Sequence, residues 1–253
     1  MKGATIAPSE DETLDILSNR LKILQRKKGH RATSDDVLLA WAIANAAQPT
    51  DQLLDLGTGK GTVAMLALSV CPNLTAVGVE AFAESAALAQ RNIILNELES
   101  RFEVLRGDLR DPTIFTGVGP FQVISGAPPF MPLGSGILPS DAQRAAGRFE
   151  LRGGVEAYYE TAARNITSDG TVIVLMDGGG AERNERAAAQ HGLFVEERID
   201  IAPRPGAFPT YSLCVSRPFE VEFRHARVTM RGLEGSSWSP WYQSVRERLD
   251  LPT

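Results

Sequence analysis

The chain has 253 residues, of which 43% are hydrophobic and 23% charged, and its formal net charge is −5 at pH 7. This length and composition are enough for one globular domain with a full core. The negative charge argues against nucleic-acid binding over the whole surface, and no apolar run reaches the roughly 18 residues of a membrane span. Since the polar stretch 1–13 does not resemble a secretory signal, we expect a cytoplasmic protein that contacts no membrane.

The first fifty residues predict small peripheral elements followed by a long helix. Residues 1–10 are expected to be disordered, a short helix is expected over 10–18, and a small strand pair over 21–31. Three residues that can cap a helix, 33–35, precede an apolar run. We therefore predict a helix that begins there and ends near residue 47.

Beyond residue 50, short apolar strands alternate with helices. Two last strands, 194–201 and 211–215, are joined through a Pro/Gly-rich turn, which suits a hairpin. This order predicts a doubly wound α/β fold, with a seven-stranded, mostly parallel Rossmann-like sheet and an antiparallel strand from the C-terminal hairpin. The other predicted strands are 53–56, 76–79, 102–105, 121–125 and 171–176, and the predicted helices are 62–70, 83–95, 155–166 and 181–191.

The sequence also suggests how the chain is divided. We expect a flexible or helical N-terminus over 1–19, the main domain over 20–217 and an aromatic-rich extension over 218–253. The extension contains Trp238, Trp241 and Tyr242. These aromatic side chains either dock on the domain or line a substrate pocket or a subunit contact.

The cysteines and histidines do not form a pattern typical of a metal site. Cys71 and Cys214 lie far apart in apolar neighbourhoods, which favours two buried thiols in a reducing compartment over a disulfide. His30, His191 and His225 share no metal-ligand spacing. We therefore expect no bound metal.

A glycine-rich turn, Asp55-Leu56-Gly57-Thr58-Gly59-Lys60-Gly61, connects a predicted strand to a helix. Such a turn lets the backbone approach a ligand closely, with helix N–H groups facing it. Its Gly-x-Gly-x-Gly spacing differs from the Gly-x-Gly-x-x-Gly of nicotinamide-binding proteins. It is not a phosphate-binding P-loop either, since Lys60 is followed by glycine and the upstream glycine is missing. Gly57, Thr58, Gly59 and Gly61 are candidate cofactor-binding residues.

Three acidic residues follow successive predicted strands, on the edge of the sheet where α/β proteins bind ligands. Asp55 suits the cationic amino-acid end of S-adenosylmethionine (SAM), and Glu80 suits the two ribose hydroxyls. Asp108, followed by Leu109, suits the adenine amine. Three such acids beside structural glycines favour SAM as the cofactor over a set of ordinary loop acids.

Charge is unevenly distributed near the N-terminus. The run Arg20–Arg31 holds six Lys or Arg and no acid. It is either a solvated face or a local patch that binds the phosphates of a partner such as tRNA.

The stretch LKILQRKKGHRATSDDVLLA, 21–40, together with the SAM motifs, resembles the bacterial tRNA(Val) adenine-N6 methyltransferases. The resemblance continues at 107–111, 127–130, 150–154 and 203–206, and spans roughly residues 20–217. It implies a SAM-dependent methyltransferase that modifies an adenine beside the anticodon. It also implies that Asp35 and its neighbours, including Arg31 and Thr33, close over the cofactor. The Pro128-Pro129-Phe130 loop would receive the base.

The chain departs from this family before the two prolines. Amine methyltransferases of this kind carry Asn, Asp or Ser there, whereas this sequence has Ala127. Because the Asn oxygen accepts a hydrogen bond from the target amine, its loss typically costs about 10²–10³ in rate. Either the acceptor is a different nucleophile, or Ser125, two residues earlier, substitutes for the Asn, or the protein binds SAM and RNA without turnover.

The candidate acceptor loop leaves further alternatives open. Phe130 either stacks on a planar substrate, worth roughly 1–3 kcal/mol per base, or packs as part of a rigid loop. Ala127, the acidic composition and the aromatic tail also fit a methyltransferase of a small heteroaromatic molecule, acting on nitrogen or oxygen. The long glycine-rich stretch 131–154 has the size of a functional lid, and its Arg144, Arg148 and Arg152 are solvated spacers or substrate contacts.

Overall fold

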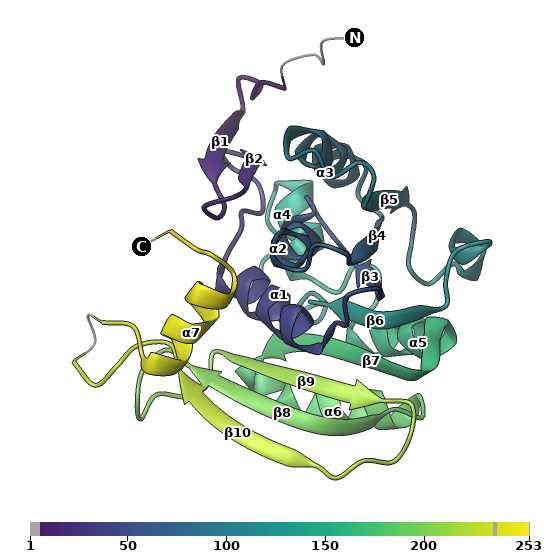
Figure 1. Ribbon diagram of the computed structural model, residues 1–253, viewed down its shortest axis with the longest axis vertical. Helices are drawn as coiled ribbons and strands as arrows, with labels where there is room; N and C mark the ends of the chain where they lie inside the picture. Colours follow the sequence, from purple (N-terminus) through teal and green to yellow (C-terminus); the bar gives the residue numbers. More distant parts are fainter. Residues whose placement is uncertain (1–5, 235–236, 253) are drawn as a thin grey trace.

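The computed structural model describes residues 6–234 and 237–252 (Figure 1). Residues 1–5, half of the segment for which disorder is predicted, lie outside the described residues. Within the described ranges, no helix is long and apolar enough to cross a membrane. Cys71 and Cys214 are both free thiols.

An eight-stranded sheet forms the centre of the molecule, in the order β10-β8-β9-β7-β6-β3-β4-β5. The pairs of β9 with β7 and with β8 are antiparallel, and the other pairs are parallel. The strands are β3 (Gln52–Leu56), β4 (Thr75–Glu80), β5 (Phe102–Arg106), β6 (Phe121–Gly126), β7 (Ile166–Asp177), β8 (Phe194–Ala202), β9 (Tyr211–Arg217) and β10 (Arg224–Thr229). The predicted Rossmann-like fold with an antiparallel C-terminal strand is confirmed.

Helices cover both faces of the sheet (Figure 1). Leu53 and Ile173 pack on the side of α1, α2 and α7, whereas their neighbours Leu54 and Val172 pack on the side of α5 and α6. This alternation buries both faces, as parallel sheets require. The helices are α1 (Ser34–Ala46), α2 (Thr62–Val70), α3 (Ala83–Leu95), α4 (Ala142–Arg148), α5 (Val155–Asn165), α6 (Ala181–Gln190) and α7 (Pro240–Arg248), with short 3₁₀ turns at Pro112–Phe115 and Gly178–Gly180.

The sheet has eight strands, one more than the seven predicted. The additional strand, β10, comes from the aromatic-rich extension and pairs in parallel with β8 at the sheet edge. Its sequence, Arg-His-Ala-Arg-Val-Thr, carries three basic residues and only a weak apolar alternation, so periodicity does not reveal it. Charged side chains are typical of a sheet edge, where they oppose further pairing.

The rest of the extension docks against the domain, the first of its two predicted arrangements. Helix α7 buries Tyr242 and Val245 in the core on the α1 side of the sheet. Trp241 contacts Trp41 of α1 edge-on, with ring centroids 5.4 Å apart. None of the extension's aromatic residues lines the cavity described below.

The N-terminal segment differs from its prediction. The helix expected over 10–18 is instead a strand, β1 (Glu12–Ile16), which pairs antiparallel with β2 (Lys22–Arg26). Of the strand pair expected within 21–31, the first strand is present as β2, whereas the second, expected before residue 31, is wrong because β1 is the partner of β2. The segment Glu-Thr-Leu-Asp-Ile alternates polar and apolar residues, and the tight turn at 17–21 lets it fold back on β2.

Two asparagines of α3, one helical turn apart, attach this hairpin to the domain. Asn92 is fully buried and accepts a hydrogen bond from the Leu24 amide at 2.7 Å. Asn96 accepts one from the Lys22 amide at 3.0 Å and donates to the Lys22 carbonyl at 2.8 Å. Strand β2 thus uses side chains of α3 as its second hydrogen-bonding edge.

Candidate active site

A cavity of about 360 Å³ opens at the carboxyl ends of β3, β4 and β6. Most of the predicted cofactor and acceptor residues line this cavity. In chain order the predicted residues along its wall are Asp35, Asp55, Gly57, Thr58, Gly59, Glu80, Asp108, Leu109, Ala127, Pro128, Pro129 and Phe130. The remaining four predicted residues, Arg31, Thr33, Gly61 and Ser125, lie outside the lining.

The turn between β3 and α2 has the open backbone that its glycines predict. Gly57, Gly59 and Gly61 have φ of 68°, 59° and 86°, in the left-handed region that favours glycine. Gly57 has a second constraint, because a Cβ there would collide with the hydroxyl of Tyr158 from α5. At Gly57 and Gly59, the backbone of this loop therefore faces the cavity directly.

Asp55 is the penultimate residue of β3 and is only 2% exposed. Its carboxylate accepts hydrogen bonds from the hydroxyls of Thr58 at 2.6 Å and Ser125 at 2.8 Å. Burial raises the pKa of Asp55 to about 6, although both hydroxyls lower it. A cation bound in the cavity would therefore stabilise the ionised form of this carboxylate.

Ser125 lies beside Asp55 because the two residues are register partners in the parallel pair β3–β6. It is 1% exposed, and its hydroxyl donates to Asp55. The structure therefore places Ser125 against Asp55 and outside the lining of the cavity.

Glu80 ends β4, and both of its carboxylate oxygens hold loop backbone. One accepts from the amide of Gly59 at 2.9 Å and the other from the amide of Phe82 at 2.6 Å. Burial raises the pKa of Glu80. The residue thus ties the glycine turn to the β4–α3 loop, and it lines the cavity.

Asp108 follows β5 and is engaged by a residue that the sequence analysis did not single out. Arg110 donates two side-chain hydrogen bonds to it, at 2.9 and 2.7 Å. This contact holds the pKa of Asp108 below its usual range. Asp108 therefore lines the cavity with its carboxylate oriented by Arg110, and this contact favours the charged form.

The start of α1 contributes acids to the cavity. Asp35 lines the cavity together with Asp36, whose side chain accepts from the amide of Thr33 at 2.9 Å and caps the helix. Burial raises the pKa of Asp36 to about 6. Arg31 points elsewhere, to Asp15 of β1 at 2.8 Å.

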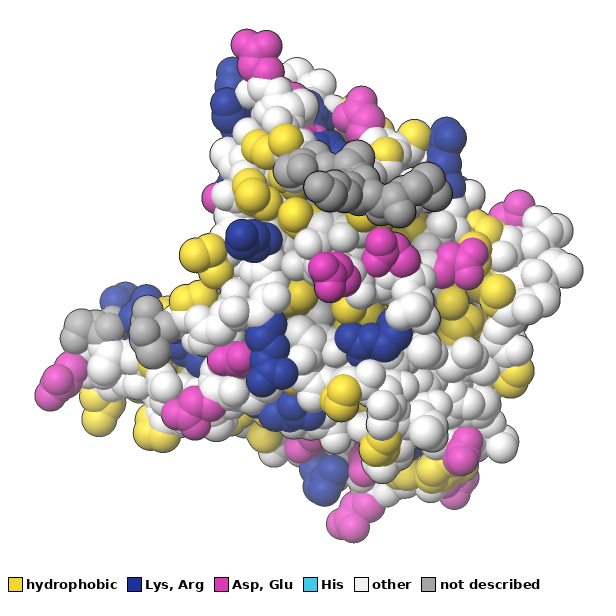
Figure 2. All heavy atoms as spheres, turned by 45° about the horizontal axis from the view of Figure 1, so that its top comes forward, with side chains coloured by type: hydrophobic (Ala, Val, Ile, Leu, Met, Phe, Trp, Pro, Cys, Tyr) yellow, Lys and Arg dark blue, Asp and Glu magenta, His cyan; other side chains and the backbone are white. Residues whose placement is uncertain are grey.

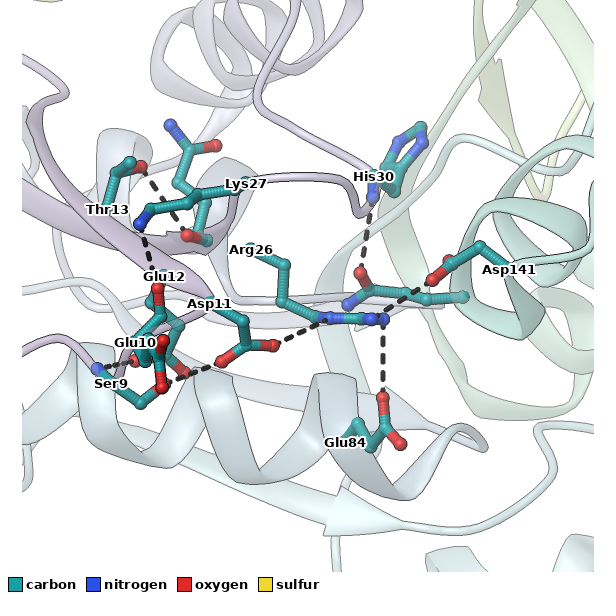
Figure 3. A network of polar contacts seen from close by, with 12 residues as sticks. Ser9, Glu10, Asp11, Glu12, Thr13, Arg26, Lys27, His30, Glu84 and Asp141 are labelled. Carbon is teal, nitrogen blue, oxygen red and sulfur yellow. Dashed lines mark hydrogen bonds and ion pairs between the residues drawn. The ribbon is translucent and has the colours of Figure 1, made fainter.

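The stretch 131–154 forms a wall over the cavity and contains α4. Gln143 of α4 accepts from the backbone amide of His30 at 3.2 Å and donates to Ser85 of α3 at 3.0 Å. Arg26 forms ion pairs with Asp141 at 3.0 Å and with Glu84 at 3.4 Å (Figure 3). The N-terminal hairpin and α3 therefore hold this segment, which we call the lid, in place.

The three arginines of the basic run Arg20–Arg31 pair with acids from elsewhere in the chain, whereas its lysines form no ion pair with a described residue. Lys27 donates to a backbone carbonyl at 2.8 Å. The arginines form ion pairs, Arg20 with Asp250 at 2.8 Å, Arg26 with Asp141 at 3.0 Å and Arg31 with Asp15 at 2.8 Å. In Figure 2, Lys and Arg side chains are scattered among Asp and Glu over the face shown, without a large field of one sign.

Sequence reasoning did not select several side chains that line the cavity. Asp36 stands next to a predicted residue, and Lys60 stands inside the glycine motif, so position alone pointed to both. Tyr158 and Gln143 arrive from helices far along the chain, and no local pattern marks them. Residues that distant elements contribute to the cavity wall can be identified only from the folded structure.

The chain matches the Methyltransferase small domain family over residues 34–135. It is 30% identical over 178 residues to a tRNA1(Val) (adenine(37)-N6)-methyltransferase from Yersinia pestis, covering 68% of each chain. It is 28% identical to the protein of the same name from Bacteroides thetaiotaomicron, covering 70% of this chain and 72% of the other. This chain belongs to the tRNA1(Val) (adenine(37)-N6)-methyltransferase family. The resemblance seen in the sequence is thereby confirmed, and the protein is a SAM-dependent methyltransferase.

Solved structures show the same fold. A predicted O-methyltransferase from Agrobacterium tumefaciens superposes with a TM-score of 0.64 at 19% identity, covering 84% of this chain and 97% of the other. The cavity of this methyltransferase also suits its cofactor SAM. The buried carboxylate of Asp55 and the half-buried carboxylate of Glu80 stand beside the glycine backbone of the cavity.

Proposed function

We propose that this methyltransferase transfers the methyl group of SAM to the N6 amine of an adenine in tRNA. The observation that carries the proposal is the position of the Pro128–Phe130 loop, which lines the same cavity as the glycine turn at Asp55. The names of its relatives describe this reaction for those proteins. A tRNA substrate implies a cytoplasmic protein.

The residues around the glycine turn would hold the cofactor. When bound, SAM supplies an electrophilic methyl group on a sulfonium. The Asp55 carboxylate pairs with the ammonium group, and the Glu80 lone pairs accept the ribose hydroxyls. Asp108 accepts the adenine amine, and Leu109 contacts the ring. The backbone of Gly57 lets the ligand approach without a side chain in between.

The acceptor side is the half-buried loop after β6. Phe130 packs against the core and lines the cavity, so its ring is held in place for stacking on a base. Ala127 offers no hydrogen-bond acceptor in its side chain, and Ser125 is engaged with Asp55. Only backbone carbonyls of this loop remain to accept from the N6 amine. We therefore expect slow transfer compared with relatives that carry Asn at this position.

Contacts with the RNA backbone are assigned to the lid. The side chains of Arg144, Arg148 and Arg152 are exposed and make no hydrogen bond or ion pair within residues 6–234 and 237–252. Arg148 and Arg152 lie at the cavity wall. Since the arginines of the basic run are paired with acids, the free arginines of the lid are better placed to meet phosphates, and binding should weaken with salt.

Methyl transfer to tRNA tests the proposal. Purified protein and labelled SAM are incubated with unmodified tRNA transcripts, and the product is digested and analysed for N6-methyladenosine. We expect slow formation of that nucleoside, a gain of about 10-fold or more for Ala127→Asn, and a loss for Phe130→Ala. Phe223→Ala, at an exposed position far from the cavity, is the matched control.

Ala127 favours a second candidate, a methyltransferase of a small heteroaromatic molecule. That function needs no amide acceptor if the nucleophile is a hydroxyl or a more basic amine. SAM binding without methylation of tRNA, by either the natural protein or Ala127→Asn, would contradict the tRNA proposal. Methylation of small nitrogen or oxygen nucleophiles would then support the second candidate. If these small molecules are not methylated either, the result would support a noncatalytic SAM-binding protein.

A further inference from the structure

Lys60 stands in the glycine turn and lines the cavity, although it is only 4% exposed. Lysine is almost never buried this far unless its charge is paired. In the part of the chain that the structure describes, the Lys60 ammonium makes no hydrogen bond and no ion pair. A buried cation that faces a cavity without a partner points to an anionic group of a ligand.

The backbone of Lys60 is held firmly. Its carbonyl accepts a hydrogen bond from the amide of Asn92 at 3.0 Å, and Asn92 also binds the backbone of Leu24. The flanking residues, Gly59 and Gly61, complete the turn. The side chain therefore extends from a fixed point, and its burial does not come from a loosely placed loop.

Two nearby acids oppose the effect of burial, which is the larger influence on the pKa of Lys60. Burial lowers the pKa of Lys60, whereas the carboxylates of Asp36 and Asp35 at the start of α1 raise it. Asp36 is itself occupied in capping α1 through the amide of Thr33. These acids supply a favourable field, but they do not reach the ammonium as an ion-pair partner.

We propose that Lys60 is the binding site for the carboxylate of the methionine part of SAM. That carboxylate shares a carbon atom with the ammonium group assigned to Asp55, so their partners must lie close together. Asp55 and Lys60 belong to the same short turn and both line the cavity, so one ligand can contact both. The inference rests on SAM as the cofactor and not on the identity of the methyl acceptor.

Other cations of the cavity wall fit this carboxylate less well. Arg148 and Arg152 are exposed on the lid, where water competes for them. His30 is half-buried, and burial lowers its pKa, which disfavours the charged form that would bind a carboxylate. Among the described lining residues, Lys60 is the buried cation, and a charged contact is strongest where water is excluded.

Ligands with and without the carboxylate test the proposal. Calorimetry would compare natural protein and Lys60→Met for binding of S-adenosylhomocysteine, decarboxylated SAM and 5′-methylthioadenosine. We expect Lys60→Met to weaken S-adenosylhomocysteine by about 10- to 100-fold, as for hydrogen bonds to charged groups. Affinities for the two ligands without a carboxylate should stay within about twofold. Lys22→Met, at an exposed position on β2, is the control and should change nothing.

Equal weakening of all three ligands would show that Lys60 only shapes the turn, and unchanged binding of S-adenosylhomocysteine would also overturn the proposal. If Lys60→Met does not fold, the proposal is tested with the natural protein alone. The proposal then requires the natural protein to bind SAM at least about tenfold more tightly than decarboxylated SAM. No methyl acceptor enters the assay. Its outcome is therefore separate from the outcome of the tRNA experiment.

Discussion

The hydroxyl of Ser125 donates a 2.8 Å hydrogen bond to the carboxylate of Asp55, across the register of two neighbouring parallel strands. This bond joins the strand that leads to the acceptor loop with the strand that carries the cofactor turn. It removes Ser125 as a substitute for the missing Asn and makes it a positioning residue for Asp55.

Ser125→Ala should shift the pH dependence of SAM binding. The pKa of Asp55 is raised from 3.8 to about 6 by burial, and the Ser125 hydrogen bond lowers it, so the variant should have a higher value. Protonated Asp55 cannot pair with the ammonium group, and SAM affinity should fall about tenfold per pH unit below the pKa. We expect the fall to begin at higher pH in the variant, measured by calorimetry between about pH 5 and 8.

Two further points check this interpretation. Since the pKa of Asp55 is raised above its unfolded value, its protonation between about pH 6 and 4 should stabilise the ligand-free fold while SAM binding weakens. Asp36 and Glu80 also have raised pKa values. The Asp36→Asn variant therefore separates the contribution of Asp36 to the pH profile from that of Asp55. Ser69→Ala is the control, and identical pH profiles for Ser125→Ala and natural protein would contradict the assignment.

Asn92→Ala should unfold more easily, because it removes three hydrogen bonds from a fully buried site. At about 1 kcal/mol per bond plus the penalty of unpaired backbone groups, the loss in free energy of unfolding should be about 2–4 kcal/mol. Urea denaturation measures it. Gln90→Ala, on the exposed side of the same helix, should stay within about 0.5 kcal/mol. A similar small change for Asn92→Ala would show that β2 is held by other contacts.

Gly57→Ala should be destabilising for two separable reasons. Its φ of 68° costs an alanine about 1–2 kcal/mol, and the new methyl group also meets the Tyr158 hydroxyl. Gly117→Ala is the matched control, since its φ is 83° and nothing lies within 4 Å of the added Cβ. We expect Gly57→Ala to cost at least about 1 kcal/mol more in urea denaturation. Adding Tyr158→Phe to Gly57→Ala should recover part of that additional loss in free energy of unfolding. An equal loss at both glycines would show that the contact with Tyr158 does not destabilise the variant.

Arg26→Met should loosen the lid without unfolding the protein. Arg26 forms ion pairs with Asp141 of the lid and Glu84 of α3, and its side chain is 25% exposed (Figure 3). Partly exposed ion pairs contribute about 1 kcal/mol or less, so stability should change little. SAM should dissociate several-fold faster in stopped-flow experiments, and trypsin should cleave at 131–154 sooner. Arg20→Met, which breaks the Asp250 pair away from the lid, should leave both rates unchanged.

Local patterns in the sequence decided much of the fold and of the cofactor site. The helices at Thr62–Val70 and Ala83–Leu95 match their predicted bounds, and the predicted strands from 53 onward are present. The turn at Asp55–Gly61 adopts the positive φ values that its glycines favour. Periodicity, capping and glycine chemistry act over a few residues, so they can be recognised without the rest of the chain.

Contacts between distant segments were decided only by the tertiary structure. The segment Glu12–Ile16 is a strand because β2 pairs with it, and β10 exists because the edge of β8 accepts it. Arg20 and Arg26 of the basic run pair with acids that lie far away in the chain, and Ser125 meets Asp55 only through strand register. Register and charge pairing depend on which elements become neighbours, and that is settled when the whole core packs.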